Sequence, residues 1–190
     1  MRWALLLMAH YPEVQQRVRE EIHEKIGKER QPRFFDRSVL RYTEAVLLEV
    51  QRFFSIVPTS LPRRAIASCK VCNFEIPADA ILITNVYAVH HDPSIWPAPD
   101  RFDPEINFIC RDKKGDIELV NTEFLIPFGV GKRLCLGESL AKQELWIFFV
   151  GILQIFSMKA HPEYPLPNLQ ELSSKGLVRA PLQYRLMFEK

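Results

Sequence analysis

The amino-acid sequence predicts a mainly α-helical fold with small β-sheets, an α+β arrangement. Three segments have the apolar spacing or continuity of helices, and a proline-rich stretch after the second contains short β-prone runs. Hydrophobic residues make up 47% of the 190 positions and charged residues 25%, as is typical of a globular protein with one apolar core. A net charge of +2 is too small to indicate a nucleic acid as the partner.

Helical periodicity is clearest in residues 12–27, which begin with a proline, repeat an apolar residue every fourth position and stop at a glycine. They predict an amphipathic surface helix. A second helix is predicted from about residue 38 to 54, and it carries Glu49 and Arg52. The apolar run 145–158 is shorter than the roughly 20 residues that cross a bilayer, so it predicts a buried core helix.

The opening residues 1–9 allow two interpretations. A basic residue precedes a short apolar run, which is a feature of signal peptides, but no small-residue cleavage site follows. Residues 58–104 hold half of the 14 prolines and predict a meander with no helix. The β-prone runs at 65–71 and 80–84 predict a small sheet within it. The tail after Pro162 predicts turns that end in a strand pair.

The four cysteines are too few and too unevenly spaced for a disulfide framework, so we expect a reducing compartment. Cys69 and Cys72 have C-x-x-C spacing, but no second pair or spaced histidines accompany them, which makes zinc or redox function a weak hypothesis. His90 and His91 are adjacent, and adjacent side chains rarely converge on one ion, so they predict ordinary histidines near a loop.

The segment 128–137 is the most informative stretch of the chain. Its glycines, Gly129, Gly131 and Gly137, permit tight backbone turns just before a helix. Cys135 would lie near that helix N-terminus, where the helix dipole stabilises a thiolate. The spacing does not fit a phosphate-binding loop. A buried structural cysteine, or a cysteine hydrolase with a distant histidine as base, are the alternatives.

The same segment resembles the haem-binding signature F-x-x-G-x-[R/K]-x-C-x-G of the cytochrome P-450 family, matched by Phe128, Gly131, Arg133, Cys135 and Gly137. The resemblance, which is to the microsomal type and family 2, implies haem as the cofactor and Cys135 as the axial ligand to its iron. It also implies that Arg133 pairs with a haem propionate and that Phe128 shields the sulfur from water.

Two further elements support the resemblance. Glu49 and Arg52 match the family motif E-x-x-R, and Pro99-Asp100-Arg101-Phe102 resembles its P-x-R-F element. The resemblance implies that Glu49, Arg52 and Arg101 form a buried triad that locks the meander behind the haem.

Other positions receive roles by the same resemblance. Arg63 would be a second propionate partner, and Val57, Leu61 and Leu177, the last in the turn Gly176-Leu177-Val178, would contact the substrate. No catalytic residue is assigned in this part of the fold.

The function implied is that of a haem-dependent monooxygenase, which inserts one oxygen atom of O₂ into a lipophilic substrate at the cytosolic face of the endoplasmic reticulum membrane. Electrons would come from NADPH through a flavoprotein reductase, with Lys132 and Lys142 as contacts for its acidic surface. We expect residues 1–190 to be the C-terminal haem-binding part of a single domain, without the N-terminal half and most of the central helix. The alternative is a non-catalytic haem-binding fragment or pseudoenzyme.

Overall fold

The computed structural model describes residues 1–171 and 177–190, so Gly176 of the predicted substrate-contact turn lies outside the described residues. The helices are α1 (Arg2–His10), α2 (Pro12–Lys25), η1 (Phe34–Ser38), α3 (Arg41–Phe54), α4 (Val86–His90), α5 (Pro104–Phe108), η2 (Thr122–Phe124), η3 (Gly131–Arg133) and α6 (Glu138–Ile155). The strands are β1 (Arg63–Arg64), β2 (Cys69–Val71), β3 (Phe74–Ile76), β4 (Ile81–Leu82), β5 (Ile109–Arg111), β6 (Ile117–Leu119), β7 (Ser157–Ala160) and β8 (Leu186–Glu189). The mainly helical fold with small two-stranded sheets is the predicted class.

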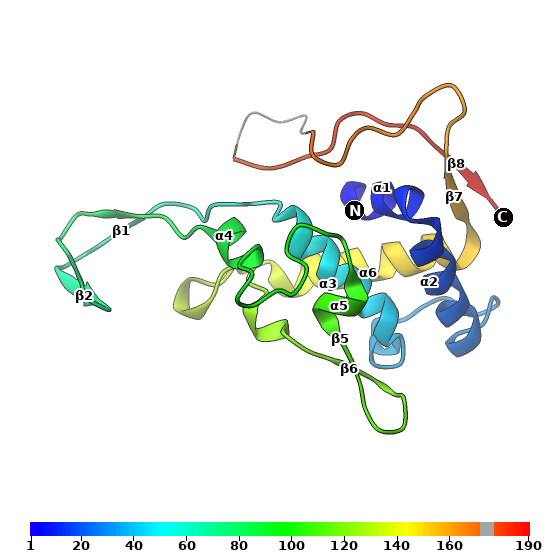
Figure 1. Ribbon diagram of the computed structural model, residues 1–190, viewed down its shortest axis with the longest axis horizontal. Coiled ribbons are helices and arrows are strands. Elements are labelled where there is room, and N and C mark those ends of the chain that lie inside the picture. Colours follow the sequence, from blue (N-terminus) through cyan, green and yellow to red (C-terminus); the bar gives the residue numbers. More distant parts are fainter. Residues whose placement is uncertain (172–176) are drawn as a thin grey trace.

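The main apolar core lies among α1, α2, α3 and α6, which pack together while the segment with β1 and β2 extends away from them (Figure 1). The opening residues form α1, which packs into this core. Its residues Leu6 and Leu7 are fully buried, and the ring of Trp3 stacks on Phe54 with centroids 3.6 Å apart.

Helix α3 begins at Arg41, three residues later than predicted. The short helix η1 precedes it. Glu21 of α2 determines this start, because its carboxylate accepts hydrogen bonds from the backbone N–H groups of Tyr42 (2.9 Å) and Thr43 (2.8 Å). These are the free donors of a helix N-terminus, and here a neighbouring helix satisfies them.

The β-prone runs form two separate sheets and not the single sheet expected. β1 pairs with β4, and β2 pairs with β3 in a hairpin on which Cys69 and Cys72 are exposed. The predicted meander also contains the short helix α4, so the expectation of no helix was wrong there. β5 and β6 enclose the charged loop, and the C-terminal strand β8 pairs with β7.

Helix α6 is buried on one side only, whereas the run 145–158 predicted a buried core helix. Trp146, Phe149 and Leu153 face the core, whereas Leu140 and Phe148 remain 63% and 60% exposed. Across residues 1–171 and 177–190, no helix has the length and apolar character needed to cross a membrane.

Candidate functional site

The cysteine loop, residues 128–137, folds back on itself immediately before α6. Gly129 (φ +79°) and Gly131 (φ +71°) take left-handed conformations that favour glycine, and the Cys135 N–H donates to the carbonyl of Phe128 (2.9 Å). The Cys135 carbonyl accepts from the N–H of Glu138 (3.2 Å), the first residue of α6. The structure therefore places Cys135 where the sequence predicted it, just ahead of the positive end of the α6 dipole.

The loop presents its cysteine to the outside. Cys135 is exposed, its neighbour Leu136 is fully exposed, and both line a hollow of about 390 Å³ beside Phe34 and Ser139. A Cβ added at Gly137 would lie 4.0 Å from the Cys135 sulfur, so glycine leaves the space beside the sulfur open. These features oppose the alternative of a buried structural cysteine.

Arg63 and Arg133 come together at this loop. A guanidinium nitrogen of Arg63, on β1, lies 3.5 Å from the carbonyl oxygen of Arg133. Among the described residues neither guanidinium forms an ion pair with a carboxylate. Two unpaired arginines next to an exposed thiol fit a ligand that carries carboxylates and a metal with affinity for sulfur, and haem has both.

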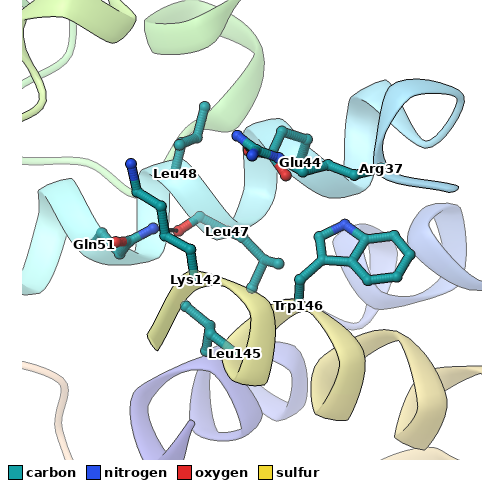
Figure 2. A pocket seen from close by; sticks show the side chains of 8 residues that line it. All are labelled: Arg37, Glu44, Leu47, Leu48, Gln51, Lys142, Leu145 and Trp146. Carbon is teal, nitrogen blue, oxygen red and sulfur yellow. Dashed lines mark hydrogen bonds and ion pairs between the residues drawn. The ribbon is translucent and has the colours of Figure 1, made fainter. Parts of the chain in front are cut away.

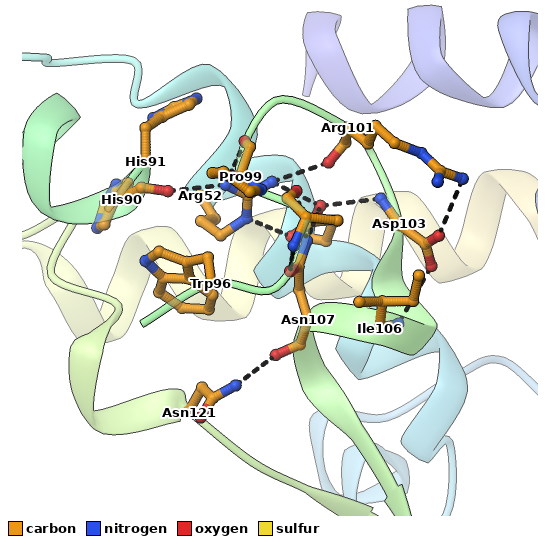
Figure 3. Close-up of polar contacts among 12 residues, drawn as sticks. Arg52, His90, His91, Trp96, Pro99, Arg101, Asp103, Ile106, Asn107 and Asn121 are labelled. Carbon is orange, nitrogen blue, oxygen red and sulfur yellow. Dashed lines mark hydrogen bonds and ion pairs between the residues drawn. The ribbon is translucent and has the colours of Figure 1, made fainter. Parts of the chain in front are cut away.

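A buried polar cluster, which we call the Arg52 cluster, joins Glu49 and Arg52 of α3 to His90, Pro99, Arg101 and Asn107 (Figure 3). Arg52 Nε and Nη2 donate to the two carboxylate oxygens of Glu49 at 2.6 and 2.9 Å, and both side chains are fully buried. The remaining N–H groups of Arg52 donate to the carbonyls of His90 (2.7 Å), Pro99 (2.8 Å) and Arg101 (2.9 Å). All five donors of the guanidinium are thereby satisfied, and α3 is tied to the meander.

Glu49 is held by more than its arginine. It also accepts from the backbone N–H of Asp103 (2.9 Å) and from the side-chain amide of Asn107 (3.0 Å). Burial raises the pKa of Glu49, while the hydrogen bonds from Arg52, Asp103 and Asn107 act in the opposite direction.

The prediction that the Arg101 side chain completes a buried triad is wrong. That side chain is 73% exposed and reaches only Asp103, and Arg101 joins the cluster through its carbonyl alone. Asn107 is the third side chain, fully buried on α5 and bonded to Glu49. No local pattern in the sequence marks Asn107 as the partner of Glu49.

His90 is the functional candidate that sequence reasoning missed, because it is fully buried at the end of α4 and not an ordinary histidine near a loop. Its Nε2 accepts from the N–H of Ile126 (2.9 Å), and its Nδ1 lies 2.8 Å from the hydroxyl of Ser55. Burial lowers the pKa of His90 to about 3, with the charges of His91 and Arg52 adding to the effect. The imidazole is therefore neutral.

The residues predicted to contact substrate lie in two segments that the fold brings together. The N–H of Arg179 donates to the carbonyl of Ile56 (2.8 Å), which joins the segment of Leu177 to that of Val57. Val57 is half-buried, whereas Leu61 and Leu177 are 57% and 49% exposed.

The two lysines proposed for a partner differ. Lys132 is exposed in the loop, but Lys142 on α6 forms an ion pair with Glu138 one turn earlier. Lys142 also lies beside a small pocket lined by Gln51 and Trp146 (Figure 2).

Comparison with known proteins gives a consistent result. The family model described as cytochrome P-450 matches residues 1–188. Cytochrome P-450 2J2 of Homo sapiens is 39% identical over 189 residues, which cover 98% of this chain and 35% of that protein. Cytochrome P-450 2D10 of Rattus norvegicus is 43% identical over 186 residues, covering 98% of this chain and 36% of that one.

A solved structure agrees. A zebrafish cytochrome P-450 determined with progesterone has a TM-score of 0.87 and 33% identity, and the match covers 100% of this chain and 42% of that chain. The chain thus spans about a third of the length of the curated relatives it matches. Identity near 40% over nearly the whole chain, together with the cysteine loop and the Arg52 cluster, shows that this chain belongs to the cytochrome P-450 family.

Proposed function

We propose that this chain forms the haem-binding part of a haem-thiolate monooxygenase, in which Cys135 would be the ligand to the haem iron. The observation that carries the proposal is the cysteine loop itself: an exposed thiol, turned outward by two left-handed glycines, directly before the N-terminus of α6. Bound haem would supply the activation of O₂ and the transfer of one oxygen atom to a lipophilic substrate.

The residues of this chain would bind and orient the haem group. The positive end of the α6 dipole favours the thiolate form of Cys135, which is the form that binds a metal. Arg133 and Arg63, which have no ion-pair partner in the described part of the chain, would pair with the haem propionates through forked donors. Phe128 would limit the access of water to the sulfur.

The partners follow from the family. Val57, Leu61 and Leu177 would contact the substrate, and electrons from NADPH would arrive through a flavoprotein reductase that contacts Lys132. Lys142 is the weaker candidate for that contact because Glu138 already neutralises its charge. We assign the whole protein to the cytosolic face of the endoplasmic reticulum membrane, as for the microsomal type.

The ligand assignment is tested by the reduced carbonyl complex of the haem-loaded chain. A thiolate ligand gives a strongly red-shifted Soret band, so Cys135→Ala should abolish that band. Cys69→Ala and Cys110→Ala are matched controls, because both cysteines are also exposed, and they should keep it. A band that persists in Cys135→Ala would disprove the assignment.

Haem binding without turnover is the second candidate. The exposed Cys135 and the hollow that it lines favour it, because oxygen activation requires a site that excludes water. The two candidates are distinguished by supplying reductase and NADPH with a set of lipophilic compounds. Product formed in proportion to reductase supports the monooxygenase, and stable haem without product supports the binding function.

A further inference from the structure

The cysteine loop has few anchors in the rest of the fold. Within the described residues, two hydrogen bonds tie the segment 126–137 to distant parts of the chain. One is the long contact of 3.5 Å between Arg63 and the Arg133 carbonyl, and the other is the 2.9 Å bond from the Ile126 N–H to His90 Nε2. A bond of 3.5 Å is at the limit of what counts as a hydrogen bond, so His90 provides the stronger anchor.

The anchored residue, Ile126, lies two residues before the cysteine loop. The Ile126 carbonyl accepts from the N–H of Gly129 (3.0 Å), which closes the first turn, and the Phe128 carbonyl within that turn accepts from the N–H of Cys135. Pro127 has no N–H to offer, so Ile126 carries the donor nearest to this turn on its N-terminal side. The far end of the loop is fixed by α6. A displacement at Ile126 therefore moves the turn on which Cys135 depends.

His90 is itself held rigidly and in one tautomer. Since the Ile126 N–H can only donate, Nε2 must be the unprotonated nitrogen and Nδ1 must carry the proton. Nδ1 then donates to Ser55 Oγ, and the Ser55 hydroxyl donates to the carbonyl of Arg52 (2.9 Å). The His90 carbonyl accepts from Arg52 Nη1, so both the side chain and the backbone of His90 are bonded to the Arg52 cluster.

We propose that His90 is a positioning residue for the thiolate ligand: it transmits the rigidity of the Arg52 cluster to the Ile126 N–H and so holds the Cys135 loop in the geometry that ligates haem. This inference rests on the proposed function, because it assumes that Cys135 is the ligand. In other proteins, removing a group that orients a metal ligand lowers the affinity for the metal by roughly 10–100-fold.

Two substitutions distinguish the hydrogen bond made by Nε2 of His90 from the one made by Nδ1. Glutamine places its side-chain oxygen near the position of Nε2, so His90→Gln keeps an acceptor for the Ile126 N–H. Asparagine is shorter and places its amide near the position of Nδ1, so His90→Asn keeps the donor to Ser55 and loses the acceptor for Ile126. Both variants lose one of the two hydrogen bonds and are matched in that respect.

The haem-loaded variants are compared by the Soret band of the reduced carbonyl complex and by the rate of haem transfer to apomyoglobin. We expect His90→Asn to lose much of the thiolate-type band and to release haem roughly 10-fold faster than the unmodified chain, whereas His90→Gln stays close to it. His91→Gln should leave both readouts unchanged, because among the described residues the His91 ring hydrogen-bonds only the Tyr87 carbonyl. Equal behaviour of the Gln and Asn variants, or an unaltered Asn variant, would overturn the proposal.

Two further results keep the outcome clear. If Cys135→Ala retains the band, the ligand assignment itself fails. If Cys135→Ala loses the band but His90→Asn keeps it, the assignment stands and only the role of His90 fails. If the His90 variants do not fold, NMR of the unmodified chain decides. An unprotonated Nε2 and a slowly exchanging Ile126 amide support the anchor, and a protonated Nε2 or a rapidly exchanging amide refutes it.

Discussion

The Arg52 cluster and the cysteine loop carry similar polar groups in opposite environments. In the cluster, every donor of Arg52 has an acceptor within the chain, and Glu49, Arg52, His90 and Asn107 are all fully buried. In the loop, Cys135 is exposed, and Arg133 forms no ion pair with any described residue. Groups satisfied within the chain serve the fold, whereas groups held outward and unpaired are available to a ligand.

The largest difference in stability should appear when one arginine from each region is replaced by alanine. Arg52→Ala strands the Glu49 carboxylate and three carbonyls in the interior, and we expect it to lower the free energy of unfolding by about 3–5 kcal/mol. Arg133→Ala is the matched change in the loop and should alter it by less than about 0.5 kcal/mol. Chemical denaturation of both variants measures the difference. Similar losses would show that the two regions are not distinct.

The second effect is a dependence of stability on pH. The pKa of His90 is about 3 in the fold and 6.5 when unperturbed, so between these values the unfolded chain binds a proton that the folded chain does not. This contribution to stability is complete above pH 6.5 and is lost as the pH falls, at a slope that approaches about 1.4 kcal/mol per pH unit. The nearby charged groups are Arg52, paired with Glu49, and His91, whose pKa burial also lowers.

Denaturation at pH values from 7 down to about 5 tests this dependence, because most carboxylates stay ionised in that range. His90→Gln is the control, since glutamine does not titrate, and its curve should be flatter. An equal slope in the unmodified chain and in His90→Gln would assign the pH dependence to other groups.

The smallest effect distinguishes the two candidates for the third member of the cluster. Asn107→Leu removes a buried donor to Glu49 and leaves the Ala98 backbone groups without their partner, so we expect a loss of about 1–3 kcal/mol. Arg101→Ala removes an exposed side chain and should cost less than about 0.5 kcal/mol. Thermal unfolding ranks the two variants. A larger loss of stability from Arg101→Ala than from Asn107→Leu would show that the Arg101 side chain is the third member of the cluster.

Local spacing in the sequence was sufficient for much of this protein. The helix of residues 12–27, the pair Glu49 and Arg52 three positions apart on one helix, and the glycine-rich approach to Cys135 depend on neighbours in the chain, and the structure contains all of them. Such features follow from the helical repeat and from the conformational freedom of glycine, which act over a few residues.

Tertiary structure alone decided where buried polar groups find partners. Glu21 sets the start of α3 from another helix, Asn107 replaces Arg101 beside Glu49, and His90 joins α4 to the cysteine loop. Each bond spans more than 20 positions of sequence. A buried donor or acceptor must be paired, but the sequence does not specify which distant group will be within reach. That choice is made when the elements pack, and it determines which residues support the cysteine loop.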